Sequence, residues 1–434
     1  MRHVRDQLQA AVAALALGAT PAPVAAQELE VTLAEAVRRA LEVQPAMVQA
    51  RGDARNAGAA LRASTGAFLP SLSTSGSAAR AGGTRLNAQT NQIVTAPPTT
   101  TFSGSLSASL ELFDGFRRFA DRSASAATQD AADAGVVNQR FQVTLETKQA
   151  FYDALAGEEL VRVAEAQVKR AGQQLKITVD KLRAGSATRS DTLRSTVDRG
   201  NARLALLQAQ ANLATAQANL GRQIGLDQPV RAVPDTALPP LPDTAALRTS
   251  AIESAPQVLQ ADAEARAARA QVGVNRAAYW PTFSASLANS YSGSEAPWVS
   301  TSAYLNGWSA RVSVSWTLFN GFTRERQLTS ASVARDVAAA RAADARRQIN
   351  AQLTQQRAAL FTTYEQIGIA QTNVDAATED LRVVSERYRV GAATILDLLT
   401  SQASLTQAEV SLVQARYDYL VARAQLEALV GHPL

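Results

Sequence analysis

Two stretches of the chain alternate apolar and polar residues with a period of two. In residues 102–112 every second position is apolar or glycine, and serine fills most of the positions between. Residues 308–318 repeat the alternation, with serine, arginine and threonine between the apolar positions. Because side chains two residues apart lie on one face of a strand, these patterns predict strands at 102–113 and 308–319, each with an apolar and a polar face.

A proline stands before each of these regions and ends a helix. Pro70 and Pro281 lack the N–H that helix propagation needs, and each restricts the residue before it. We therefore expect helices at 33–63 and 244–277. The hairpins that follow are expected at 70–113 and 281–319, with first strands at 71–80 and 282–292 and loops at 81–101 and 293–307.

The start of the first helix carries a capping signature. Thr32 is a suitable N-cap residue, and Glu35 stands three positions later. In a capping box the threonine hydroxyl accepts from the N–H of the third helical residue, and the glutamate carboxylate accepts from the N–H of the cap. This pair predicts a helix that starts at residue 33.

Two much longer helices follow the hairpins. Residues 116–183 contain no proline, and at 1.5 Å per residue they would form a rod of roughly 100 Å. Alanine, leucine and valine recur there at steps of three and four, which favours close packing of helix on helix. The second rod is expected at 322–390, and return helices are expected at 190–224 and 394–430.

The chain is a tandem duplication. The strand-to-helix joints LFDGFRR and LFNGFTR are followed, in the same order, by the turns RAGSATRSD and RVGAATILD. The separation between matching residues is constant from the joints onward. We therefore expect a first repeat at 27–226, a proline-rich linker at 227–243 that runs over the surface, and a second repeat at 244–434.

The N-terminus has the features of a secretory signal peptide. Arg2 and Arg5 precede a short apolar stretch at 8–19, and a small-residue cleavage site ends at Ala26. Residues 1–26 are therefore expected to be absent from the mature chain. No later run approaches the ~20 apolar residues of a membrane-spanning helix.

Composition removes several classes of function. The chain has 434 residues, no cysteine and two histidines, His3 and His432. Neither a Ser-His-Asp arrangement nor a His/Cys metal cluster can be assembled from these residues. We expect no enzyme activity, no metal and no cofactor. The formal charge of +5 is spread along the helices, so nucleic-acid binding is not expected.

The helices alone are compatible with either a soluble scaffold or a membrane protein, and the strands help to distinguish the two. Packed rods alone would suit a soluble periplasmic coiled-coil scaffold. Strands of about 10–12 residues with an apolar face suit a membrane, where four of them cannot close a barrel. Two copies would supply eight strands, and three copies would supply twelve around an open lumen. The tryptophans gather in the second hairpin region, as in an interfacial girdle: Trp280, Trp298, Trp308 and Trp316.

Together, the joints, the duplicated turns and the prolines resemble the TolC-type outer-membrane efflux channel family over residues 33–434. The resemblance implies a mainly α-helical trimer. Four strands per chain would form a 12-stranded outer-membrane barrel, continued by a long antiparallel α-helical tunnel through the periplasm. The implied function is a passive exit duct of a tripartite efflux or type I secretion system. The implied partners are a periplasmic adaptor protein, an inner-membrane pump and outer-membrane lipid.

The resemblance also implies a gate at the periplasmic tips. Asp397 matches an acidic ring residue, whose symmetry copies would repel one another and attract cations. Thr400 stands at the family's second acidic position. Asp191 and Tyr388 match a latch pair, with Ser190 beside them in the first tip. Stabilising a helix N-terminus is the alternative role for both aspartates.

Two further features of the tips follow from the resemblance. Ala393 stands where the family carries a latch arginine, and Arg189 is a candidate substitute from the first repeat. Gly185 and Gly391 would end the long helices as C-cap residues. By the resemblance, they would also form the notches that receive the adaptor's hairpin.

The joints have a bending role in the same comparison. Gly115 and Gly321 would permit the tight backbone turn between a lipid-facing strand and a tunnel helix, while Pro70 and Pro281 begin the hairpins. Because the helices lie at one end of each hairpin, the loops at the other end would face outside the cell.

Overall fold

A computed structural model describes residues 29–434, apart from 88, 90, 235–237, 243–251, 298 and 300–303. The expected signal peptide at 1–26, the start of the helix expected at 244–277, and Trp298 therefore lie outside the described residues. The chain divides into two compact units. The tip unit comprises residues up to 40, 147–239 and 366–418, and the sheet unit comprises 41–146, 240–365 and 419–434.

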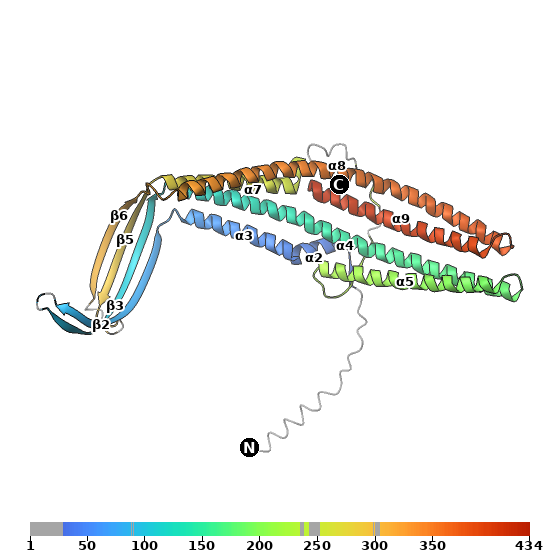
Figure 1. Ribbon diagram of the computed structural model, residues 1–434, viewed down its shortest axis with the longest axis horizontal. Coiled ribbons are helices and arrows are strands. Elements are labelled where there is room, and N and C mark those ends of the chain that lie inside the picture. Colours follow the sequence, from blue (N-terminus) through green and yellow to red (C-terminus); the bar gives the residue numbers. More distant parts are fainter. Residues whose placement is uncertain are drawn as a thin grey trace, which may run out of the picture. The chain divides into compact units, whose positions relative to one another are not determined.

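The sheet unit contains one antiparallel sheet of four strands in the order β2, β3, β5, β6 (Figure 1). Pairing of β3 with β5 joins the hairpin of the first repeat to the hairpin of the second. As a result, β2 and β6 form the two edges of the sheet. The strands are β2 (Ser71–Asn87), β3 (Gln92–Phe113), β5 (Thr282–Gly293) and β6 (Leu305–Ser315).

The first hairpin is longer than the sequence predicted. We expected a loop at 81–101, but β2 and β3 extend through most of it. Threonine, isoleucine and valine are frequent in this part of β3 and favour extended backbone. A bulge between Ala81 and Gly83 accommodates the two prolines of β3 that lie opposite. In the second hairpin, β6 ends at Ser315, before the expected end at Phe319.

The two faces of the sheet differ as the alternation predicted. On the apolar face, large side chains are exposed in the single chain: Leu72 is 72% exposed, Trp308 77% and Val312 71%. On the polar face, serine hydroxyls pair across β2 and β3 at Oγ–Oγ distances of 2.7–2.8 Å. The pairs are Ser71–Ser109, Ser73–Ser107, Ser75–Ser105 and Ser77–Ser103.

Each strand-to-helix joint turns through two successive left-handed residues. Gly115 has a φ of +68° and Phe116 a φ of +64°, and Gly321 and Phe322 have φ values of +65° and +64°. Glycine adopts this conformation readily, but a phenylalanine there is strained. Each long helix therefore begins one residue later than expected.

Arg118 fastens the first joint. Its guanidinium pairs with the carboxylate of Asp114 at 3.1 Å, and the Asp114 side chain is only 4% exposed. It also donates to the carbonyl of Leu112 at 3.2 Å, and it lies over the Phe68 ring at 5.2 Å from the centroid. One side chain therefore connects the end of the strand at Leu112, the joint at Asp114 and the segment around Phe68 that precedes the hairpin.

Arg324 fastens the second joint with a similar set of contacts. It donates to the carbonyl of Thr317 at 3.2 Å and lies over the Tyr279 ring at 4.1 Å. The buried carboxylate has no counterpart, because a neutral side chain, Asn320, stands there and accepts from the Arg324 backbone N–H at 3.4 Å. Sequence reasoning did not identify either arginine, although both joint motifs contain one at the same place.

The helix expected at 33–63 is interrupted. It forms two helices because Gln44 is extended and Pro45 starts a new helix. No helix in the described part of the chain is long and apolar enough to cross a membrane. The helices are α2 (Leu33–Val43), α3 (Pro45–Gly66), α4 (Arg117–Arg183), α5 (Arg189–Gln223), α7 (Pro256–Arg276), η1 (Ala277–Tyr279), α8 (Thr323–Arg389) and α9 (Ile395–Val430).

The tip unit contains a short parallel strand pair that the sequence did not predict. β1 (Leu29–Val31) pairs with β4 (Val230–Ala232). Val230 is fully buried, so this part of the expected linker at 227–243 does not run over the surface. The two strands pack against α2, α4 and α5 in one core: Val31, Ala36, Phe151, Ala154, Leu155, Leu220, Ile224, Val230 and Ala232.

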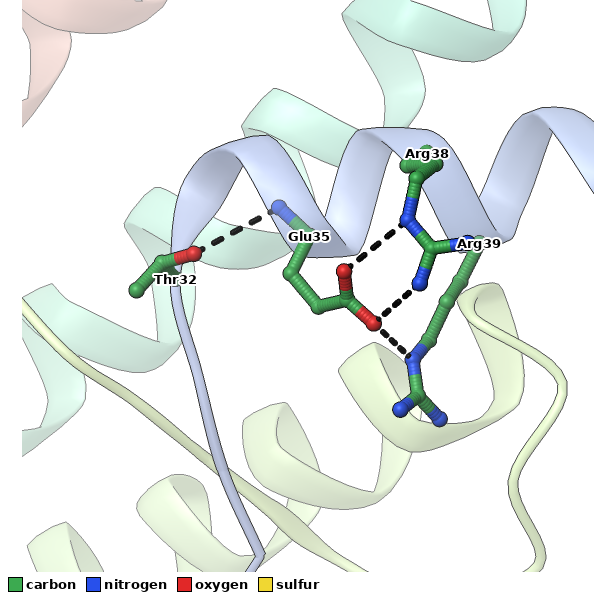
Figure 2. Close-up of polar contacts among 4 residues, drawn as sticks. All are labelled: Thr32, Glu35, Arg38 and Arg39. Carbon is green, nitrogen blue, oxygen red and sulfur yellow. Dashed lines mark hydrogen bonds and ion pairs between the residues drawn. The ribbon is translucent and has the colours of Figure 1, made fainter.

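Figure 2 shows the start of α2, where half of the expected capping box forms. The Glu35 N–H donates to the Thr32 hydroxyl at 3.4 Å. The Glu35 carboxylate instead binds the guanidinium groups of Arg38 at 2.7 Å and Arg39 at 2.6 Å (Figure 2). Hydrogen bonds from Arg38 and then Arg39 lower the pKa of Glu35 to about 2.

Replacing Glu35 by glutamine should lower the Tm near pH 7 and have little effect near pH 2. The pKa of Glu35 is lower in the folded chain than its ordinary value of 4.5. Its ionised form therefore contributes stability that is fully present above that value and is lost as the pH falls towards 2. The Tm of both proteins should be compared across this range. A difference independent of pH would contradict an ionic origin.

Arg118→Met should destabilise the protein far more than Arg324→Met. The first substitution leaves the buried Asp114 carboxylate without its cation, which costs about 3–5 kcal/mol. The second removes one hydrogen bond to the Thr317 carbonyl, which costs about 1 kcal/mol. It also removes a partly exposed ion pair with Glu325 at 3.4 Å, which contributes about 0–1 kcal/mol. Thermal unfolding in detergent measures both losses, and Asp114→Asn should partly rescue Arg118→Met. Equal losses from the two arginines would show that the Asp114 pair does not determine the difference.

Candidate functional site

The two helix-turn-helix tips of the tip unit share one backbone design. Gly185 and Gly391 have φ values of +75° and +84°. After the first glycine, the Ser186 N–H donates back to the carbonyl of Lys181 at 2.9 Å, and the second tip repeats this bond at 2.7 Å. Such bonds satisfy carbonyls at a helix C-terminus. Both glycines therefore end the long helices, as expected from the sequence.

Each return helix begins with a capping box that uses one of the predicted gate acids. In the first, Asp191 Oδ2 accepts from the Thr188 N–H at 2.9 Å and from the Thr188 hydroxyl at 2.8 Å. In the second, Asp397 Oδ2 accepts from the Thr394 N–H and hydroxyl, both at 2.8 Å. The capping role that the sequence left open is thus present at both tips.

These bonds also fix the charge of the two acids. For Asp191, the backbone N–H of Thr188 is the largest influence that lowers the pKa, followed by the Thr188 hydroxyl. For Asp397, the same two groups of Thr394 lower the pKa in the same order. Both carboxylates are therefore ionised at neutral pH. Asp397 is exposed and presents its charge to solvent in the single chain.

Tyr388 lies in the last turn of α8 and is 7% exposed. It packs against Ile395 and Leu398 at the start of α9, with Ala393 beside them. In the described part of the single chain, no hydrogen bond joins the Tyr388 hydroxyl to Asp191. The latch between these two residues stays a prediction.

The remaining predicted tip residues lie on the surface. Ser190 and its neighbour Arg189 are exposed in the first turn of α5, and Thr400 is exposed in the second turn of α9. Among the described residues, no contact brings these three side chains together. The predicted joint residues belong to the sheet unit and act in the bends and hairpins described above: Gly115, Gly321, Pro70 and Pro281.

Buried hydroxyl groups beneath each tip were not identified from the sequence: Thr178, Ser195 and Ser401. In the first repeat, the Thr178 hydroxyl lies 3.2 Å from that of Ser195 and receives a bond from Gln174 at 3.1 Å. In the second repeat, Ser401 donates to Asp380 at 2.6 Å. Serine and threonine occur on every face of these helices, so the sequence pattern could not distinguish the buried ones.

Lys181 was also missed, and it contacts a predicted gate residue. Its ammonium group lies 4.1 Å from the centroid of the Tyr388 ring and donates to the Tyr388 carbonyl. The tips therefore offer ionised carboxylates, a phenol and a cation. No group of three or more metal-ligating side chains is found in the part of the chain that the structure describes.

Comparisons with known proteins agree with this architecture. The chain is 27% identical over 333 residues to outer membrane efflux protein BepC of Brucella suis biovar 1, covering 74% of this chain and 70% of BepC. It is 25% identical over 373 residues to the probable efflux pump outer membrane protein TtgC of Pseudomonas putida, covering 84% and 75%.

A solved structure and a family model complete the comparison. The outer membrane protein VceC of Vibrio cholerae has the same fold, with a TM-score of 0.76, 18% identity and coverage of 92% of this chain and 96% of VceC. The family model described as outer membrane efflux protein matches residues 36–226 and 247–432, in both repeats. This match overrides the soluble scaffold interpretation. The chain belongs to the outer membrane efflux protein family.

Proposed function

We propose that three copies of this chain form a passive exit duct through the outer membrane. The observation that carries this proposal is the sheet with two open edges and an uncovered apolar face. The sheets of three copies would supply twelve strands around a water-filled lumen, with the serine pairs towards the lumen and the exposed leucine, valine and tryptophan side chains towards lipid. The helices of the three chains would then enclose the tunnel in the periplasm.

The edges support assembly from several copies. Within one chain, the second strand of the first hairpin pairs with the first strand of the second hairpin. Because the hairpins are repeats, β6 of one copy would pair with β2 of the next in the same way. In hydrocarbon each unsatisfied backbone group costs several kcal/mol, so a membrane-embedded sheet cannot leave these edges open.

The joints support the same arrangement independently. A Cβ on Gly115 would lie 2.6 Å from the Ala277 carbonyl oxygen and from Trp280 Cβ, whereas a Cβ on Gly321 would meet nothing within 4 Å. The residues of the first repeat that match Ala277 and Trp280 are Gly66 and Leu69. Leu69 is 69% exposed in the single chain. Another copy would bring this segment against Gly321.

The tips would form the gate. Asp397, exposed and ionised, would lie near its symmetry copies and attract cations to the narrow end of the tunnel, with Thr400 one turn further. Asp191, Ser190 and Tyr388 would take part in closure. Gly185 and Gly391 would lie where a periplasmic adaptor docks, and TtgC, by its name an efflux pump component, supports an inner-membrane pump as the second partner.

The direct test is reconstitution of the mature protein in a planar lipid bilayer. The proposal predicts discrete conductance steps from particles that contain three chains, counted by native mass spectrometry. A soluble scaffold would give a particle that leaves bilayer conductance unchanged. Addition of a nucleotide should not alter the steps, because a passive duct receives energy from its partner.

Gly321→Ala should weaken assembly as much as Gly115→Ala does. At both positions a left-handed alanine costs about 1–2 kcal/mol. The added Cβ would also clash at both: at 115 with Ala277 and Trp280 of the same chain, and at 321 with a segment of the neighbouring copy in the assembled duct. The measurement is the fraction of intact trimer after graded heating. If Gly321→Ala is much milder than Gly115→Ala, no other copy covers the second joint.

Asp397→Asn should reduce the preference of the channel for cations and weaken block by divalent cations severalfold. It removes the ring charge and retains a side-chain oxygen for the cap. Thr394→Ala is the matched control, because it breaks the capping box and keeps the charge. The reversal potential in a salt gradient measures the preference. An unchanged potential in Asp397→Asn would remove this residue from the permeation path.

A further inference from the structure

The tip unit contains a cation that bridges its two hairpins. Lys181 lies in the last turn of α4, and Tyr388 lies in the last turn of α8. The Lys181 ammonium group sits 4.1 Å from the centre of the Tyr388 ring, within the range of a cation–π contact. The same group donates a hydrogen bond to the Tyr388 backbone carbonyl. One side chain thus binds both the ring and the main chain of the opposite hairpin.

The helix terminus strengthens this contact. Carbonyl groups in the last turn of a helix carry its partial negative charge and lack intrahelical partners. The Tyr388 carbonyl is one of these, and the Gly391 N–H also donates to it at 3.2 Å. Lys181 therefore acts as a C-cap for α8 that is supplied by α4.

The equivalent position in the second repeat does not form such a bridge. Arg387 matches Lys181, but it donates to the Ala392 carbonyl in its own turn at 3.3 Å. Leu182 matches Tyr388 and offers no aromatic ring. The bridge is therefore particular to one of two otherwise similar tips, so it is not a consequence of the repeated fold.

A second polar link between the hairpins lies further from the turns. Arg170 of α4 binds the Glu409 carboxylate of α9 through both terminal nitrogens, at 2.7 and 3.1 Å, and also the Thr406 hydroxyl at 3.2 Å. Between this anchor and the turns, Lys181 makes the one polar link between the hairpins among the described side chains. If the Arg170–Glu409 link stays intact, the two tips can separate only when the contacts of Lys181 with Tyr388 break.

We propose that Lys181 is a positioning residue that fastens the tip of α4 to the tip of α8 and keeps the resting gate closed. This inference rests on the proposed function as a gated duct. A shielded cation–π contact together with a charged helix cap should change the ratio of open to closed tips by about tenfold, which corresponds to about 1.4 kcal/mol.

The absence of native cysteine makes a chemical test possible. Lys181→Cys in the full mature protein carries a single thiol, which 2-bromoethylamine converts into a thioether with a terminal ammonium, close to lysine in length and charge. Iodoacetamide gives a neutral adduct at the same atom. Lys176→Cys, at an exposed lysine on the same helix, provides the matched control with both reagents.

The readout is the resting open probability of single channels in planar bilayers. Lys181→Cys and its neutral adduct should be open about tenfold more often than the unsubstituted protein, the aminoethylated form should return to the original value, and the Lys176→Cys series should not change. The inference is overturned if Lys181→Cys rests as closed as the original, if both adducts restore closure, or if neither does. If the unsubstituted protein forms no channels at all, the proposed function fails instead.

Discussion

The assembly depends on one requirement: the backbone N–H and C=O groups along the edge strands β2 and β6 need hydrogen-bond partners. A single chain satisfies the inner strands of its sheet and leaves both edges open. In water such edges can be hydrated, but in hydrocarbon they cannot. In the proposed duct this sheet lies in the outer membrane, so its edges would pair with those of further copies of the same chain.

Duplication explains how one chain can provide both sides of every contact. The β3–β5 pairing and the contact of Gly115 with Trp280 are contacts of the first repeat with the second inside one chain. Their counterparts, a β6–β2 pairing and a covered Gly321, require the second repeat to meet the first repeat of another copy. The repeats are not identical, however. Asp114 is replaced by Asn320, so the second joint lacks the buried carboxylate of the first. Lys181 is replaced by Arg387, which keeps the charge but binds a carbonyl in its own turn.

Much of the fold was predictable from the sequence because it depends on simple patterns. The alternation of apolar and polar residues predicted the strands and their two faces. The prolines predicted where the hairpins begin, and the glycines predicted the turns that end the long helices. The pair β1 and β4 was missed because three-residue strands show no period, and their pairing spans most of the first repeat. The extension of the first hairpin is hard to predict because prolines are uncommon inside strands, whereas here a bulge accommodates the two that are present.

The site was less predictable than the fold. Capping of Asp191 and Asp397 follows from their distance to Thr188 and Thr394, so local sequence was sufficient for it. The contacts of Lys181 with Tyr388 and of Arg118 with Asp114 depend on how side chains meet in three dimensions. A lysine in the last turn of a helix is ordinary in sequence, and only the position of the neighbouring helix end reveals its role.

Pairing of β6 with β2 between copies is the central claim, and the repeats specify its register. Ser107 lies opposite Ala288 within the chain. The matching residues, Ser313 and Ser77, should therefore lie opposite each other between copies. In the otherwise cysteine-free chain, the double variant Ser77→Cys and Ser313→Cys should oxidise in the membrane to a covalently closed ring of three chains. A product that remains a single chain under these conditions, with normal amounts of folded protein, would contradict the account.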